Sequence, residues 1–195
     1  MLRYFMTINA FINCSRGDCL KLYLGTNNER GIRILGEGKI RCSIDRIHDS
    51  SYAHLATTDG YTYMTDEIPV AIYYGNKAQV NIPPISAGNY YLFEIEIDID
   101  ELHPDIDELR IQNTWQPIQK EESDFTVEDS LSLVHSVTVT RDLLISTDVV
   151  RYAILPDANS LDHDLLHITK ECIFYRPNQG TSIPESVNQI PWLTL

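Results

Sequence analysis

The most regular hydrophobic pattern in the chain lies near its middle. Two sets of residues alternate there: Tyr91, Phe93, Ile95, Ile97 and Ile99, and Leu92, Glu94, Glu96, Asp98 and Asp100. A period of two sends successive side chains to opposite faces of a β-strand. The pattern therefore predicts a half-buried strand whose outer face is a solvated acidic row, or a sheet edge protected by charge.

Shorter runs of apolar and β-branched residues, bounded by turn signals, predict further strands. They cover residues 4–12, 21–26, 60–64, 136–139, 149–154 and 172–175. Residues 42–60 and 103–127 are polar and rich in turn-forming side chains, so loops are expected there, followed by a short turn at Asp129 or Ser130.

Helix signals are fewer and the helices they predict are short. The asparagines at 27–28 are good N-caps for a helix that carries Ile32 and Leu35 on one face. Glycines at 36 and 38 end that helix. A second helix is capped at 65–66, carries Pro69 in its first turn and ends at Gly75, and a third is expected around residues 161–166.

Strands thus outnumber helices and occur in mixed order. The predicted fold is α+β, with antiparallel or mixed sheets, and not a doubly wound parallel sheet. A length of 195 residues predicts one domain. A hydrophobic fraction of 43% and a charged fraction of 22% exclude a disordered tail and a coiled coil.

Charge and cysteine content narrow the partners and the compartment. With 28 acidic and 15 basic residues the net charge is −13, which argues against unaided docking on nucleic acid or an anionic membrane and favours a basic partner protein. No apolar run reaches the roughly 18 residues of a membrane span, and no signal peptide is evident. A cytoplasmic protein is expected, with reduced thiols at Cys14, Cys19, Cys42 and Cys172.

Common catalytic and metal motifs do not occur in the sequence. A P-loop, a GxGxxG turn and a GxSxG elbow are all absent. His163 and His167 lie four residues apart without the HExxH context of a zinc site, so a polar helix face is expected and no metal site is predicted.

The order of several short segments resembles the ADP-ribosyltransferase family, which includes toxins and polymerases of ADP-ribose. The sequence LYLGT at 22–26 precedes the first helix, and GYTYMT at 60–65 precedes a helix containing Ala71 and Tyr74. Downstream, residues 93–98, the Pro-Asp-x-Asp segment within 102–109, Ser130-Leu131 and residues 137–152 look like a bacterial and phage branch. The resemblance covers about residues 20–155 of a single domain, with 156–195 as an extension, and implies split sheets.

The resemblance also implies an activity and a site. NAD would be the substrate, and its ADP-ribose would pass to a macromolecular target, a protein more than a nucleic acid. Nicotinamide would be held by Tyr23, Gly25 and Thr26, and the pocket lined by Tyr61, Tyr63 and Tyr74. Glycine permits close backbone approach, and tyrosine rings can stack on nicotinamide.

Breaking the glycosidic bond creates a cationic sugar that a carboxylate stabilises. The candidates for that acid are Asp105, Asp107, Glu108 and Glu128, with Glu94 and Glu96 on the predicted strand as further choices. Glycine 25 as a plain turn residue, and the acids of 105–108 as turn formers, are the structural alternatives.

Two departures from the family pattern leave the function open. Leu24 stands where the family often has His in the first turn, and Val139 where some relatives carry a polar residue or His. The first hypothesis is an NAD-dependent ADP-ribosyltransferase. The alternative is a catalytically silent relative that works as an acidic binding or inhibitory protein, for example phage-encoded against a host protein. A weaker option is a sensor that binds NAD or ADP-ribose without cleaving it.

Overall fold

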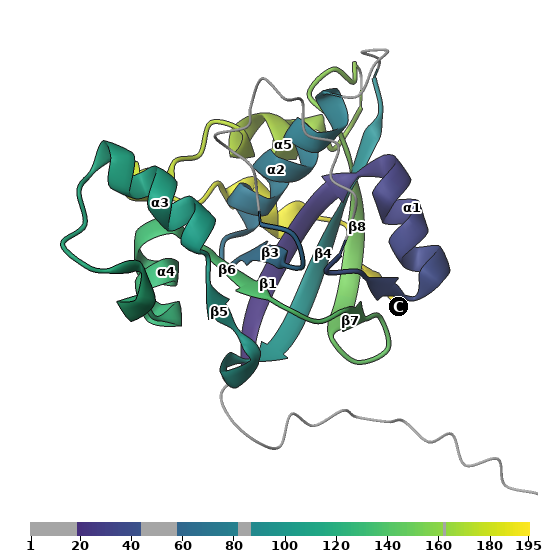
Figure 1. The fold of residues 1–195 in the computed structure, drawn as a ribbon. Helices are drawn as coiled ribbons and strands as arrows, with labels where there is room; N and C mark the ends of the chain where they lie inside the picture. Colours follow the sequence, from purple (N-terminus) through teal and green to yellow (C-terminus); the bar gives the residue numbers. More distant parts are fainter. Residues whose placement is uncertain (1–18, 44–57, 82–86, 162) are drawn as a thin grey trace, which may run out of the picture.

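A seven-stranded sheet forms the centre of the molecule (Figure 1). The computed structural model describes residues 19–43, 58–81, 87–161 and 163–195. The strand order is β5-β6-β3-β1-β4-β8-β9, and β2 and β7 form a separate two-stranded sheet. The strands are β1 Cys19–Asn27, β2 Lys39–Ile40, β3 Thr62–Thr65, β4 Asn89–Asp98, β5 His103–Pro104, β6 Ser136–Val139, β7 Leu143–Leu144, β8 Val149–Pro156 and β9 Leu193–Thr194.

Neighbouring strands pair in antiparallel fashion, so the α+β prediction with a mostly antiparallel sheet is confirmed. The strand predicted at 4–12 lies outside the described residues. The strand predicted at 172–175 is wrong, because Cys172 ends a helix, α5 Leu166–Cys172, whose buried face also includes Ile168 and Thr169. Among the described cysteines, Cys42 and Cys172 are free thiols and Cys19 is disulfide-bonded, so the expectation of reduced thiols is wrong for Cys19.

The helices cover both faces of the sheet. They are α1 Asn28–Glu37, α2 Ile68–Val80, α3 Ile106–Trp115, α4 Val127–Val134 and α5, with short 3₁₀ turns η2 Ile99–Glu101, η3 Glu122–Asp124, η4 Pro177–Gln179 and η5 Glu185–Gln189. In Figure 1, α1 lies at one side of the sheet and α3 and α4 at the opposite side. No helix within the described ranges is both long and apolar enough to cross a membrane.

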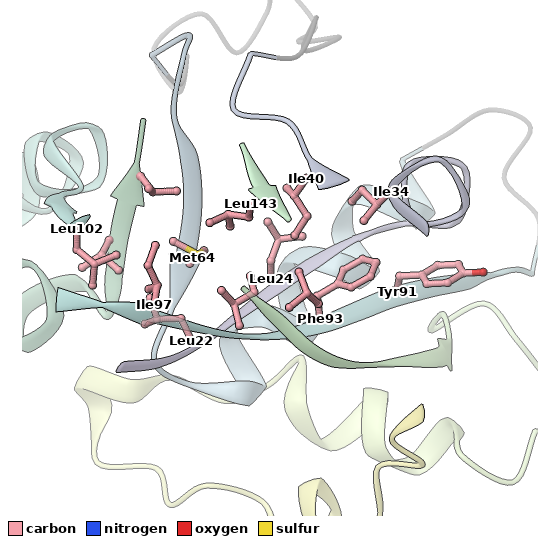
Figure 2. Close-up of a cluster of buried hydrophobic side chains, with 14 residues drawn as sticks. Leu22, Leu24, Ile34, Ile40, Met64, Tyr91, Phe93, Ile97, Leu102 and Leu143 are labelled. Carbon is pink, nitrogen blue, oxygen red and sulfur yellow. The ribbon is translucent and has the colours of Figure 1, made fainter. Parts of the chain in front are cut away.

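Each face of the sheet has its own hydrophobic core. The first core includes Leu22, Leu24, Met64, Phe93 and Ile97, and Figure 2 shows these side chains beneath α1 and the β2–β7 pair. The second core lies under α2, α5 and η5, and its buried members are Tyr23, Ala71, Ile72, Tyr90, Leu92, Ala153, Leu155, Ile168, Cys172 and Ile190. Successive residues of β4 thus enter opposite cores, as a period of two requires.

The alternation in β4 is therefore correct, but its outer face is not the solvated acidic row that we expected. Glu94 is only 2% exposed, because α2 and the C-terminal segment cover this face. Its carboxylate accepts a hydrogen bond from Arg151 Nη2 at 2.6 Å and lies 3.4 Å from Lys21 Nζ. Arg151 in turn stacks on Trp192, with its guanidinium carbon 4.4 Å from the ring centroid. Of the other acids in the predicted row, Glu96 and Asp100 are exposed and Asp98 is half-buried.

The first two helices differ from expectation in one respect each. In α1, Asn27 accepts the cap bond from the Arg30 N–H at 2.8 Å as expected, but Ile32 is 55% exposed and Ile34 is the buried residue. The second helix does not end at Gly75 but continues to Val80. Gly75 is buried in mid-helix, where a Cβ would lie 2.6 Å from the ring of Tyr90.

The segment 103–127, expected to be a loop, contains all of β5, α3 and η3. Helix α3 begins because Asp105 is its N-cap, accepting a hydrogen bond from the Glu108 N–H at 3.0 Å. Helix α4 begins at a capping box in which Thr126 and Asp129 exchange side chain to backbone bonds. Local capping signals therefore outweighed the polar composition that suggested a loop.

Replacing Glu94 by Gln should lower the free energy of unfolding by roughly 3 kcal/mol, because the buried carboxylate that both cations share would be lost. Glu96→Gln is the matched control at an exposed position of the same strand and should change stability little. Urea unfolding of the two variants measures the difference. Equal stability of both variants would contradict the proposed role of the buried ion pair.

Candidate functional site

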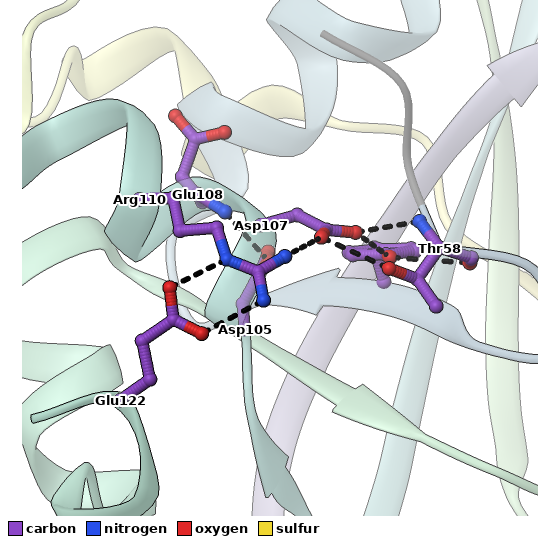
Figure 3. A network of polar contacts seen from close by, with 7 residues as sticks. Thr58, Asp105, Asp107, Glu108, Arg110 and Glu122 are labelled. Atoms are coloured by element: carbon purple, nitrogen blue, oxygen red, sulfur yellow. Dashed lines mark hydrogen bonds and ion pairs between the residues drawn. The ribbon is translucent and has the colours of Figure 1, made fainter. Parts of the chain in front are cut away.

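Several residues singled out in the sequence meet where β3 faces the first turn of α3. The Tyr63 hydroxyl donates to Asp107 Oδ2 at 2.5 Å. Asp107 also accepts hydrogen bonds from the Thr58 N–H at 2.6 Å and from the Thr58 hydroxyl at 3.0 Å (Figure 3). Burial acts to raise the pKa of Asp107, but these hydrogen bonds outweigh it and hold the pKa below its usual range.

Asp105 lies beneath this network and is only 3% exposed. One carboxylate oxygen caps α3, and the other accepts from the Ser136 hydroxyl at 2.5 Å. Its own N–H donates to Ser130 Oγ at 2.8 Å, and that hydroxyl donates to the Ser136 carbonyl at 2.6 Å. Burial raises the pKa of Asp105, and the bonds from Ser136 and the Glu108 N–H only partly oppose the rise.

Glu108 interacts electrostatically both with Asp105 and with Lys77 of α2. Burial raises its pKa, the negative charge of Asp105 adds to the rise, and Lys77 opposes it. Tyr74 is on the same helix as Lys77, and its pKa is raised first by removal of the hydroxyl from solvent and then by the charge of Glu108. Asp105, Glu108 and Tyr74 therefore form a group in which a negative charge on one member makes ionisation of its neighbour less favourable. Shifted pKa values of this kind occur at functional sites and also in structural networks.

Arg110 closes the outer side of the group. Its guanidinium donates to both carboxylate oxygens of Glu122, at 2.7 and 2.8 Å, and to Asp107 Oδ1 at 3.4 Å. Figure 3 shows Arg110 between these two carboxylates. A planar guanidinium bound to a carboxylate at two points fixes the geometry of the pair, so η3 is tied to α3.

The residues expected to hold nicotinamide do not form an open site. A Cβ on Gly25 would lie 1.9 Å from the Ala71 carbonyl oxygen and 2.7 Å from the Gly75 nitrogen. The close approach that Gly25 allows is therefore taken by the backbone of α2. Tyr23 and Thr26 are 8% and 2% exposed, and the Tyr23 ring lies 6.4 Å from that of Trp192.

The remaining two candidates lie at the margins. The ring of Tyr61 is 6.5 Å from that of Tyr63, so Tyr61 adjoins the network. Glu128 is exposed in the first turn of α4 and takes no part in the network of Figure 3. Of the six acids considered, Asp105, Asp107 and Glu108 lie together, and Glu128 and the two acids of β4, Glu94 and Glu96, lie elsewhere.

Alternation along β1 separates the predicted residues onto two faces of the sheet. Tyr23 belongs to the second core and Leu24 to the first, so Gly25 shares the face of Tyr23 and Thr26 that of Leu24. Met64 belongs to the first core, which places its neighbour Tyr63 on the opposite face. The position where the resemblance expects His therefore lies on the far side of the sheet from the acids, 5% exposed among apolar side chains.

Two hollows of the described surface lie elsewhere. One, of about 580 Å³, is lined by Gly38, Ile145, Ser146, Val149, Val150 and Leu195. The other, of about 430 Å³, is lined by Glu171, Phe174, Tyr175, Gly180, Thr181, Ser182 and Pro184. Neither includes a residue predicted to bind NAD. Within the described residues, no group of three or more His, Cys, Asp or Glu is placed to hold a metal ion.

Several residues of this region carry no signal in the sequence. Thr58, Lys77, Arg110 and Ser136 come from four distant segments, and no local pattern marks them. His135 was also missed: it has a positive φ of 53° at the end of α4, and its Nδ1 lies 3.2 Å from Asp66. The cap of α3 could have been found, because Asp105 followed three residues later by Glu108 is a helix-start signature.

Replacing Gly25 by Ala should lower the free energy of unfolding by roughly 1–3 kcal/mol, because the added methyl group overlaps the backbone of α2. Gly36→Ala is the matched control, since a Cβ there meets nothing within 4 Å in an exposed helical turn. That control should raise stability by roughly 0.5–1 kcal/mol. Thermal unfolding of both variants measures the contrast, and a neutral Gly25→Ala would contradict the close packing.

The stability of the fold should depend on the ionisation of Asp105. The unfolded carboxyl titrates near 3.8, and burial raises the pKa in the folded state. Between the two pKa values the folded chain holds more protons than the unfolded chain, so the free energy of unfolding falls as pH rises above about 4. Asp105→Asn keeps an N-cap but cannot ionise, so it should flatten this fall in urea unfolding across that pH range. Equal slopes in both proteins would refute the shift, and Asp124→Asn serves as an exposed control.

Comparison with known proteins assigns no family to this arrangement. No protein-family model matches the chain, and no curated protein or solved structure matches it. The resemblance to ADP-ribosyltransferases therefore depends on the residues of this sequence alone, and the chemistry of the site has to be inferred from its contacts and charges.

Proposed function

We propose that this chain is a catalytically silent protein-interaction module that binds a basic partner protein. The observation that carries the proposal is the concentration of its charge. Residues 98–129 contain eleven Asp and Glu against two Lys and Arg, which accounts for nine of the thirteen net negative charges. A strong field of one sign over a limited surface steers oppositely charged proteins toward it.

Both cations of this segment are already paired within the chain. Arg110 is bound by Glu122 and Asp107, and Lys120 is bound by Asp129. Neither cation is left to attract an acidic partner, so the surface formed by residues 98–129 is anionic. Exposed ion pairs of this kind add little stability, and their effect here is to shape the charge distribution.

Three features of the β1 region weigh against NAD turnover. Leu24 offers no hydrogen bond and is sealed in the first core, the free side of Gly25 is filled by α2, and the two described hollows lie away from both. A nicotinamide ring would have to displace packed apolar side chains, which costs several kcal/mol in a close-packed interior.

A second candidate function is NAD-dependent ADP-ribosyl transfer, favoured by the convergence of Tyr63, Tyr74 and the acids of α3. Glu108 would be the acid for that reaction, because Asp105 and Asp107 have both carboxylate oxygens engaged in hydrogen bonds. As a carboxylate it would stabilise the sugar cation left when nicotinamide departs. The leaving nicotinamide takes the electron pair of the glycosidic bond, and the target nucleophile then bonds to the anomeric carbon.

One incubation separates the two functions. The purified chain, with NAD carrying a label in its ADP-ribose moiety and a bacterial lysate, should release no nicotinamide above buffer and transfer no label. Immobilised chain should retain a protein of basic isoelectric point without NAD, and more at about 50 mM than at about 500 mM salt, because salt screens the attraction. Nicotinamide release that is lost in Glu108→Gln but kept in Glu128→Gln would establish the transferase instead.

A further inference from the structure

Trp115 is the most exposed aromatic side chain among the described residues. It is the last residue of α3 and is 83% exposed. The exposed indole leaves a large aromatic area that a partner side chain can cover. Trp is also the residue most enriched among those that dominate binding energy at protein interfaces.

Helix α3 holds this side chain away from the body of the molecule. Leu109 is its one buried residue, and the helix packs chiefly on α4. Figure 1 shows α3 projecting beside the sheet, with the connection to α4 looping outward beyond it. The outer face of α3 and residues 116–124, which we call the α3 surface, are largely exposed.

The α3 surface is held in shape by its own contacts. The bidentate bond of Arg110 to Glu122 ties η3 to the helix. The Asn113 side chain accepts from the Ile118 N–H at 2.6 Å, and the Gln116 N–H donates to the Gln112 carbonyl at 2.9 Å. A surface organised before binding loses less conformational entropy when a partner docks.

The charge of the α3 surface indicates which kind of partner it binds. The acidic side chains of Glu121, Glu122 and Asp124 follow Trp115 and are exposed, and the nearby cations are internally paired. A nucleic acid or an anionic membrane would be repelled. An Arg or Lys side chain is attracted both by the carboxylates and by the face of the indole ring.

We infer that the α3 surface docks an Arg- and Lys-bearing segment of a partner protein, with a cationic side chain of that segment stacked on Trp115. The inference depends on the proposed function and adds the place of docking and the chemistry of the partner. Trp115 supplies the apolar contact area, and the exposed carboxylates of Glu121 and Asp124 supply the selection for positive charge.

The probe for this inference is a synthetic peptide rich in Arg and Lys, compared with the same peptide in which Gln replaces each cation. Binding is followed by indole fluorescence in a Trp192→Phe background, so that the signal comes from Trp115, and affinities are measured by calorimetry. The test variants are Trp115→Ala and the double variant Glu121→Gln with Asp124→Asn. The charge-matched control is Glu171→Gln with Glu185→Gln, two exposed acids outside the α3 surface.

We expect each test variant to weaken the cationic peptide at least about 10-fold, the control to change it less than about twofold, and the Gln peptide not to bind. The side chains changed in the test and control variants are exposed, so these variants should keep the melting temperature of the Trp192→Phe background, which is checked. Equal weakening in the test and control variants overturns the α3 surface as the docking place. Tighter binding of single-stranded RNA than of the peptide also overturns it, because the indole would then be a base-stacking platform.

The lysate capture described above distinguishes the two levels of the proposal. If the chain retains a basic partner and Trp115→Ala retains it equally, the docking place is wrong and the proposed function stands. If the chain retains no basic partner and releases nicotinamide from NAD, the proposed function itself is wrong.

Discussion

The backbone contact between β1 and α2 is the constraint on which the rest of the structure depends. Gly25 and Gly75 meet without side chains between them, so α2 lies directly on a central strand of the sheet. That depth places the outward residues of α2, Tyr74 and Lys77, beside the first turn of α3. A Cβ on Gly25 would force the helix away and separate these groups.

The same contact decides which face of β1 is available for chemistry. With α2 on one face, that side is a packed layer, and the other side is filled by the first core around Leu24. Tyr23 is buried on one face of β1 and Leu24 and Thr26 on the other, so this part of the strand presents little surface to a ligand. Polar groups therefore gather at the end of the sheet, beside β3, β6 and α3. There the partly buried carboxylates of Asp107 and Asp105 accept hydrogen bonds from the hydroxyls of Tyr63 and Ser136.

The acidic residues of the chain fall into a buried group and an exposed group. Glu94 and Asp105 are buried and each has a specific partner, which stabilises the fold. The exposed acids beside η3 and α4, Glu121, Asp124 and Glu128, lie outside both cores and set the surface potential. The negative charge of this protein is thus partly structural and partly a property of one projecting surface.

The sequence by itself determined the strands with a period of two or a β-branched run, the cap at Asn27, and the α+β class, because these depend on neighbours within a few residues. It also pointed to Tyr63, Asp105, Asp107 and Glu108, which do lie together. Only the tertiary structure decided that Glu94 is buried, that Gly25 faces a helix and that Leu24 lies across the sheet from the acids. Those outcomes depend on which segments pack on each face, and contacts between residues far apart in the chain leave no local pattern in the sequence.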